Sequence, residues 1–197
     1  MHYAKCHINI VIGVLRMFNC CSSSSFDEAR YPIGIFEPAE EITKNLLTKY
    51  INDLNIIPSR LEESLNKLTQ EQLNYSYRLD GWTIRQVVHH LADTHMNAYI
   101  RFKLALTESN PLVKTYDEVQ WAELFDGATA PIDTSLAIIN GLHKRWGILI
   151  DSLTEDELKR NFNHPVSGSS SIERLIEFYS WHGRHHIAHI NMIIEDK

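Results

Sequence analysis

Apolar residues recur along this 197-residue chain with the spacing of helices that bury one side. The first of these helices is predicted within residues 40–67. The second apolar stripe starts after Thr83, which can cap a helix running to about Leu106. A third covers roughly residues 133–153. Near the C-terminus, at about 100° per residue, a further segment gathers its apolar side chains on one side: Ile172, Leu175, Ile176, Tyr179, Ile190 and Ile193.

The first predicted helix is interrupted. Residues 40–52 and 58–67 have helical patterns, with a break expected before Pro58. A proline disfavours helical geometry in the residue that precedes it, here Ile57. We therefore expect two helical pieces in this part of the chain.

Two long connections join the predicted helices. Residues 108–131 form an insertion between the second and third helices, and residues 159–171 end at Ser171, a candidate cap for the last helix. Whether the insertion roofs a functional pocket, contacts another subunit or packs on the surface stays open at this point. Four substantial helices, no convincing strand alternation and no repeat predict an all-α four-helix bundle with a crossover after the second helix.

Two histidines lie near the middle of the last apolar stripe. His182 and His186 are four residues apart, so their imidazoles stack one turn above the other and face the interior. Two buried imidazoles need two sets of partners, and one metal ion satisfies both, which favours a metal site over simple packing. His185 and His189 fall about 100° and 60° from His186 and are expected at the edges, in supporting or surface roles.

A third ligand can come from the second predicted helix. His95 lies about 40° from Leu91 on the apolar stripe, and His90 lies about 100° away at its edge. The spacing leaves both open, with His95 better aligned, while His89 points away and is expected to be solvated. His143, in the third helix, is another interior histidine, which we interpret as packing or support because a lone buried histidine is usually structural.

Composition narrows the class of protein. The net charge of −6 and the lack of a basic stripe argue against a nucleic-acid partner. Cys6, Cys20 and Cys21 are the only cysteines, so residues 31–197 need no disulfide, which is typical of a reducing cytoplasm. Residues 1–30 hold an apolar run too short to span a bilayer, and we expect a disordered extension, residues upstream of a later start, or, less favoured, a secretory signal. Residues 31–197 are expected to form one domain.

Several strings of the chain, in order, resemble the DinB/YfiT-like metalloenzymes, and specifically the YfiT branch of metal-dependent hydrolases related to bacillithiol transferases. They are Tyr31–Pro38, Asp80–Asn97, Tyr99–Leu104 and Trp181–Ile190. The resemblance covers nearly everything from Tyr31 onward and implies a four-helix bundle of the DinB/YfiT type with a long crossover insertion. By motif position it implies that His90, His182 and His186 hold the metal, and it implies a homodimer. The choice of His90 over His95 rests on the resemblance alone.

Three protein ligands leave at least one coordination position open, as in catalytic zinc sites. We expect one divalent metal ion per subunit, zinc first and nickel as the alternative, because imidazoles suit several first-row metals. A bound water would support hydrolysis of a small-molecule substrate, whereas a bound low-molecular-weight thiol would support bacillithiol-type S-transfer. Asp93, near His90, could orient a ligand or act as a base, and Arg85 and Arg184 could orient an acidic substrate. The competing class is a non-catalytic metal-binding stress module without membrane or nucleic-acid contacts.

Overall fold

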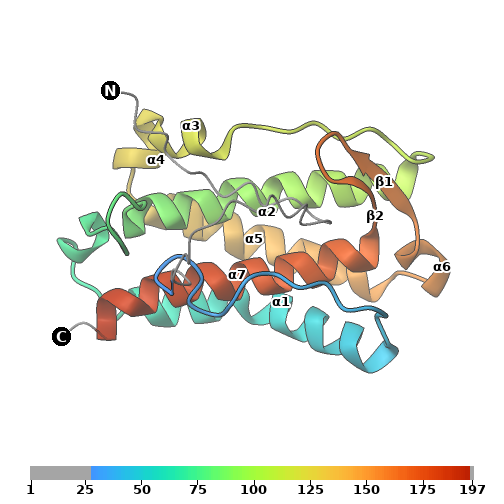
Figure 1. Ribbon diagram of the computed structural model, residues 1–197, viewed down its shortest axis with the longest axis horizontal. Helices are drawn as coiled ribbons and strands as arrows, with labels where there is room; N and C mark the ends of the chain where they lie inside the picture. The colour runs from blue at the N-terminus through green and yellow to red at the C-terminus, as the bar shows by residue number, and fades with distance from the viewer. Residues whose placement is uncertain (1–27, 196–197) are drawn as a thin grey trace, which may run out of the picture.

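The computed structural model describes residues 28–195, so the expectations for residues 1–27 lie outside the described part of the chain. Four long helices lie alongside one another (Figure 1). They are α1 (Lys44–Leu65), α2 (Ile84–Thr107), α5 (Ile132–Asp151) and α7 (Ile172–Glu195). The predicted all-α four-helix bundle is therefore confirmed.

Shorter elements fill the connections between the long helices. They are η1 (Gln72–Asn74), α3 (Glu118–Glu123), α4 (Phe125–Thr129), α6 (Glu155–Leu158), β1 (Asn161–His164) and β2 (Gly168–Ser171). The two strands pair antiparallel, with Asn161 opposite Ser171. This hairpin was not predicted, because strands rich in asparagine, serine and glycine lack the alternating apolar pattern of a half-buried strand.

The predicted break in the first helix is wrong. Helix α1 is continuous, with Pro58 buried inside it. Leu54, Ile57 and Leu61, on the same side as the proline, are at most 1% exposed. Helix α1 packs against α5 and α7, and this burial holds the helix together across a residue that cannot donate the usual main-chain hydrogen bond.

Local capping fixes where α2 and α7 begin. The Thr83 hydroxyl accepts from the Gln86 amide at 3.2 Å, and the Gln86 side chain accepts from the Thr83 amide at 3.0 Å, which forms a capping box. Ser171 Oγ accepts from the Arg174 amide at 3.3 Å, as predicted. These caps set the starting points of the two helices that carry the histidines of interest.

A glycine allows α7 to approach α1 closely. A Cβ atom at Gly183 would lie 2.2 Å from Ile57 Cδ1 and 2.7 Å from Ile57 Cγ1. The contact sits between His182 and His186 in the sequence, so the close approach positions the turn that carries both imidazoles.

The insertion between α2 and α5 runs back along α2. It starts beside the hairpin, where the Val113 amide donates to the Asn163 carbonyl at 2.9 Å. The chain then passes along α2 to α3 and α4, which pack on that helix (Figure 1). The insertion thus covers α2 over much of its length.

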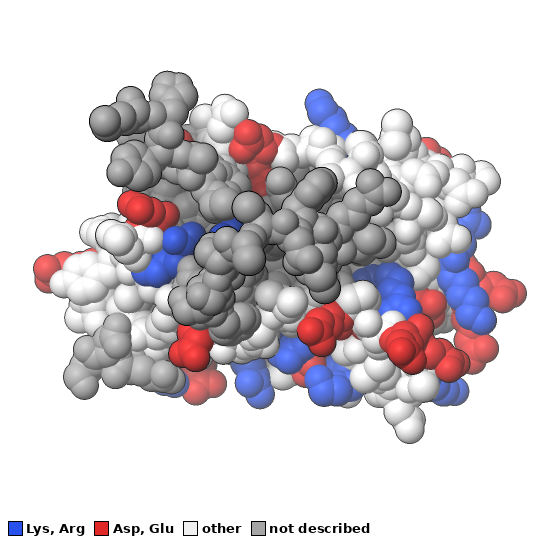
Figure 2. Space-filling view, in the orientation of Figure 1, with Lys and Arg blue, Asp and Glu red and all other residues white. Residues whose placement is uncertain are grey.

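The surface carries charges of both signs. Acidic and basic side chains are interspersed on the face shown in Figure 2. Among the described residues, the helices are too short or too polar to cross a bilayer.

Candidate metal centre

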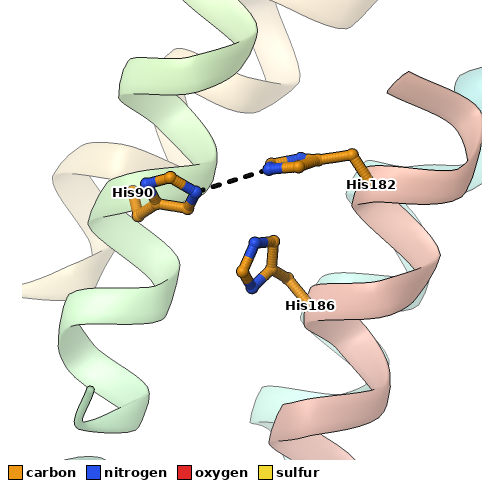
Figure 3. A group of neighbouring side chains, drawn as sticks. All are labelled: His90, His182 and His186. Carbon is orange, nitrogen blue, oxygen red and sulfur yellow. Dashed lines mark hydrogen bonds between the residues drawn. The ribbon is translucent and has the colours of Figure 1, made fainter. Parts of the chain in front are cut away.

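Three imidazoles from two helices converge inside the bundle (Figure 3). His90 of α2 and His182 and His186 of α7 are each at most 5% exposed, and each offers a ring nitrogen within 4.8 Å of the others. His90 Nε2 and His182 Nε2 are 3.4 Å apart. Two nitrogens bound tetrahedrally to one ion at about 2.0–2.1 Å would be separated by roughly 3.3–3.4 Å. The observed spacing therefore suits two ligands of one ion.

A relay of histidines fixes the proton on His182. His182 Nδ1 lies 3.3 Å from His95 Nε2, and His95 Nδ1 lies 2.9 Å from His143 Nε2. His143 Nδ1 is 3.0 Å from the Leu54 carbonyl oxygen. Because a carbonyl can only accept, His143 must donate to it, His95 must donate to His143, and His182 must donate to His95. The lone pair of His182 is then on Nε2, which faces His90.

The relay ends on a carbonyl that Pro58 leaves free. In an α-helix the carbonyl of residue 54 accepts from the amide of residue 58, but proline has no amide proton. The Leu54 carbonyl therefore lacks its usual helical donor, and His143 of α5 supplies the hydrogen bond instead. The proline that failed to break α1 thus creates the terminal acceptor of the relay.

A second relay acts on His186. His189 Nε2 lies 3.2 Å from the Arg30 carbonyl oxygen, and His189 Nδ1 lies 3.3 Å from His186 Nδ1. By the same reasoning His189 donates to the carbonyl and His186 donates to His189. The lone pair of His186 is then on Nε2, which is buried and has no hydrogen-bond partner in the described part of the chain. A buried acceptor without a donor is costly, and a bound cation would satisfy it.

Burial keeps the three imidazoles neutral, which is the form that binds a metal. Desolvation lowers the pKa of His90 to about 3 and holds the pKa values of His182 and His186 well below the ordinary value. Trp82 contributes to this apolar surrounding, with its ring 4.6 Å from the His90 ring. The donor set and its protonation state are therefore those of an imidazole metal site.

The insertion supplies a hydroxyl beside this group. Tyr116 of the insertion lies with its hydroxyl 2.7 Å from Thr94 Oγ1, which is 3.3 Å from His90 Nδ1 and Nε2. Of the possibilities left open for the insertion, the structure thus shows contact with the histidine site. The proximity of Tyr116 to His90 could not be predicted from the sequence, because only the folded insertion brings them together.

The expected solvation of His89 is wrong, and of the supporting and surface roles left open for His185 and His189 the surface role is excluded. His89, expected to be solvated, is 6% exposed and bonds to Ser135 Oγ at 2.8 Å, because α5 and the end of the insertion cover that side of α2. His185 and His189, expected at edges, are completely buried. The Trp181 ring stacks on His185 at 4.6 Å and Tyr77 stacks on His189 at 3.9 Å, so aromatic side chains close both edges.

Other predicted residues lie apart from the three imidazoles or act through neighbours. His95, the alternative ligand, instead bonds to the far nitrogen of His182, and His143 supports it as expected. Asp93 is half-buried, and desolvation together with the charge of Asp126 raises its pKa to about 6. Its role in the site stays a prediction.

The two arginines suggested for an acidic substrate are engaged elsewhere. Arg85 donates to the Asn74 side chain and the Ala130 carbonyl. Arg184 donates to the Ser180 carbonyl and lies 3.5 Å from Asp53. Both side chains thus hold surface elements together.

The protein is thus a four-helix bundle with three buried, neutral imidazoles that form a candidate metal centre. The chain belongs to the DinB superfamily, which it matches over residues 54–190. This confirms the family resemblance seen in the sequence.

Well-matched relatives span nearly the whole described chain. A protein of Oceanobacillus iheyensis is 51% identical over 168 residues, covering 85% of this chain and 97% of the relative. One of Bacillus mycoides is 48% identical, covering 85% and 96%. Both carry the name "Putative metal-dependent hydrolase". YfiT from Bacillus subtilis has a solved structure that matches with a TM-score of 0.83 and 45% identity, covering 86% of this chain and 97% of YfiT. It is described as a "probable metal-dependent hydrolase with an unusual four-helix bundle topology".

Proposed function

We propose that this protein is a metal-dependent hydrolase that holds one divalent ion with His90, His182 and His186. One observation carries the proposal: among the described residues His186 Nε2 is a buried lone pair without a donor, in a group whose ligand atoms lie within 4.8 Å of one another. The names of the relatives support the same activity. Zinc is the first expectation for the ion and nickel the alternative, because an all-imidazole set accepts both.

The metal would supply an activated water, since a catalytic ion lowers the pKa of bound water to about 7. The chain's own residues prepare the site around it. The two relays keep the Nε2 lone pairs of His182 and His186 directed at the centre. Trp82 limits access of bulk water beside His90, and the hydroxyls of Thr94 and Tyr116 can donate hydrogen bonds to a substrate oxygen. Asp93, with its raised pKa, is proposed as the proton acceptor.

Metal analysis of the full-length protein tests the ligand assignment. We expect about one ion per subunit in the wild type and strong loss of metal in His186→Ala, which deletes the unpartnered nitrogen. His164→Ala is the matched control, because His164 lies on β1, outside the group of three, and should leave the metal content unchanged. Stoichiometric metal in His186→Ala would refute the assignment.

Turnover assays with and without an added low-molecular-weight thiol test the reaction. Thiol-independent cleavage of small ester or amide substrates, lost in His186→Ala, supports the hydrolase. Turnover only with a bacillithiol-type thiol would replace it with the S-transferase. Full metal occupancy with neither reaction would favour the non-catalytic stress module.

We also infer a homodimer located in the cytoplasm. The first rests on the family resemblance and the second on the lack of cysteines in residues 31–197. Sedimentation of the purified protein tests the oligomeric state, and fractionation of cells tests the location.

A further inference from the structure

Two charged residues other than histidine are buried among residues 28–195, and they differ in how they are compensated. Glu177, 2% exposed, accepts hydrogen bonds from Arg174 at 2.8 Å, from the Ala39 amide at 2.7 Å and from the Tyr50 hydroxyl at 3.1 Å. Arg101, 8% exposed, donates to the Lys114 carbonyl at 3.1 Å. Its Nε has no hydrogen-bond partner.

Arg101 lacks an acidic partner among residues 28–195. Within the described part of the chain, no carboxylate lies within 4.0 Å of its guanidinium group. A buried cation without a counter-charge costs several kcal/mol. Its planar fork of N–H groups matches a carboxylate or a phosphate in two-pronged geometry. The guanidinium group of Arg101 is therefore suited to bind an anion.

Arg101 faces the same way as His90. Eleven residues separate them on α2, which corresponds to a rotation of only about 20° and a rise of roughly 16 Å. Helical side chains lean toward the helix N-terminus, and the longer arginine side chain reaches further in that direction than the imidazole, so the two groups can lie closer together than this rise. One small molecule can span that distance.

Two tyrosines, the buried Tyr179 and the partly buried Tyr116, lie between Arg101 and the imidazoles. Tyr179 lies close enough to Arg101 to interact with its charge, and its ring centroid lies 5.6 Å from that of His182. Tyr116 interacts electrostatically with Arg101, and its hydroxyl hydrogen-bonds with Thr94 beside His90. Burial raises the pKa of both phenols, so both keep their protons and can donate to an anion. The strip from Arg101 to His90 is thus lined by donors.

We propose that Arg101, with Tyr179, binds the anionic end of the substrate, a carboxylate or a phosphate, while the reacting end lies at the three imidazoles, beside Thr94 and Tyr116. This rests on the proposed function for the reacting end. The substrate is then an acidic small molecule with less than roughly 16 Å between its anionic group and the bond that is cleaved.

Calorimetric titration of the metal-loaded full chain tests the proposal with three probes: succinate, its neutral diamide succinamide, and inorganic phosphate. The wild type should bind succinate or phosphate and not succinamide. Arg101→Gln should weaken anion binding at least tenfold, and Arg101→Lys should weaken it less, because lysine keeps the charge without the fork. The matched control is Arg184→Gln, which removes a half-exposed arginine already near Asp53 and should bind like the wild type.

Thermal unfolding separates binding from folding. Loss of an uncompensated buried charge should leave the melting temperature of Arg101→Gln unchanged or higher. A lower melting temperature with unaltered anion binding would overturn the proposal, as would equal binding of succinate and succinamide by the wild type.

The same titration in His186→Ala keeps this proposal distinct from the metal assignment. Succinate binding that persists without metal supports the Arg101 site. Binding that disappears in His186→Ala but survives in Arg101→Gln would place the anion on the metal and refute the Arg101 site.

Discussion

Replacing His143 by leucine should weaken metal binding without touching a ligand. The variant removes the acceptor for His95 Nδ1 and leaves the Leu54 carbonyl without a donor. If His95 keeps its proton on Nδ1, a buried N–H stays unsatisfied, which costs about 1–3 kcal/mol. If the proton moves to Nε2, His95 donates to His182 Nδ1 and drives the His182 proton onto Nε2, where it blocks the metal.

The metal-binding tautomer is disfavoured by that same 1–3 kcal/mol, so the affinity should fall about 5- to 150-fold. Competition with a chromophoric zinc chelator measures the affinity. His143→Gln is the control, because its amide can accept from His95 and donate to the Leu54 carbonyl, and it should stay within about threefold of the wild type. Long-range proton–nitrogen NMR spectra report the tautomer of His182. The relay would be refuted if His143→Leu bound zinc like the wild type, or if His182 kept its proton on Nδ1 in that variant.

Three further predictions concern stability. Gly183→Ala forces a methyl group against Ile57 and should cost about 1–3 kcal/mol in denaturant unfolding; adding Ile57→Val should recover much of the loss, and no recovery would contradict the clash. Burial lowers the pKa to about 3 for His90 and about 4 for His189. As the pH falls, the unfolded chain therefore takes up protons before the folded protein does. The free energy of unfolding of the metal-free protein should fall by roughly 1.4 kcal/mol per pH unit for each such imidazole between about pH 6.5 and 4. A free energy of unfolding that does not change over this range would argue against neutral burial. The raised pKa of Asp93 means that its ionised form opposes folding as the pH rises through about 6. Asp93→Asn should raise stability by roughly 1 kcal/mol at pH 8, after allowance for solvent screening, and by nothing at pH 4, which melting at both pH values checks.

The bundle could be predicted because each long helix buries a stripe of its own residues, and the spacing of these apolar residues is visible in the sequence. His182 and His186 were predictable for the same reason, since both belong to one helix. The choice between His90 and His95 was not, because it depends on how α2 is rotated against α7. Both histidines prove to touch His182, one at its metal-facing nitrogen and one at the other nitrogen. This explains why the spacing left them nearly equal.

The burial of a side chain by residues outside its own helix could not be predicted from the sequence. His89 is covered by Ser135 and the Ala130 carbonyl, and His189 by Tyr77 and the Arg30 carbonyl. Each covering group comes from a connection or another helix, so no periodicity within one segment reveals it. Arg101 escaped for the opposite reason: a polar residue at a stripe edge is usually solvated, and only the folded insertion encloses it.

Pro58 sets a limit on engineering this protein. A designer seeking stability would replace a proline inside a helix, because alanine restores the missing hydrogen bond and removes a penalty of about 3 kcal/mol. Here the restored amide would compete with His143 for the Leu54 carbonyl. Replacing Pro58 would thereby weaken the hydrogen bonds through His143 and His95 that keep the proton of His182 on Nδ1. The gain in stability would come with weaker metal binding. Selection for a more stable helix and selection for a tighter metal site therefore act in opposite directions on this one residue.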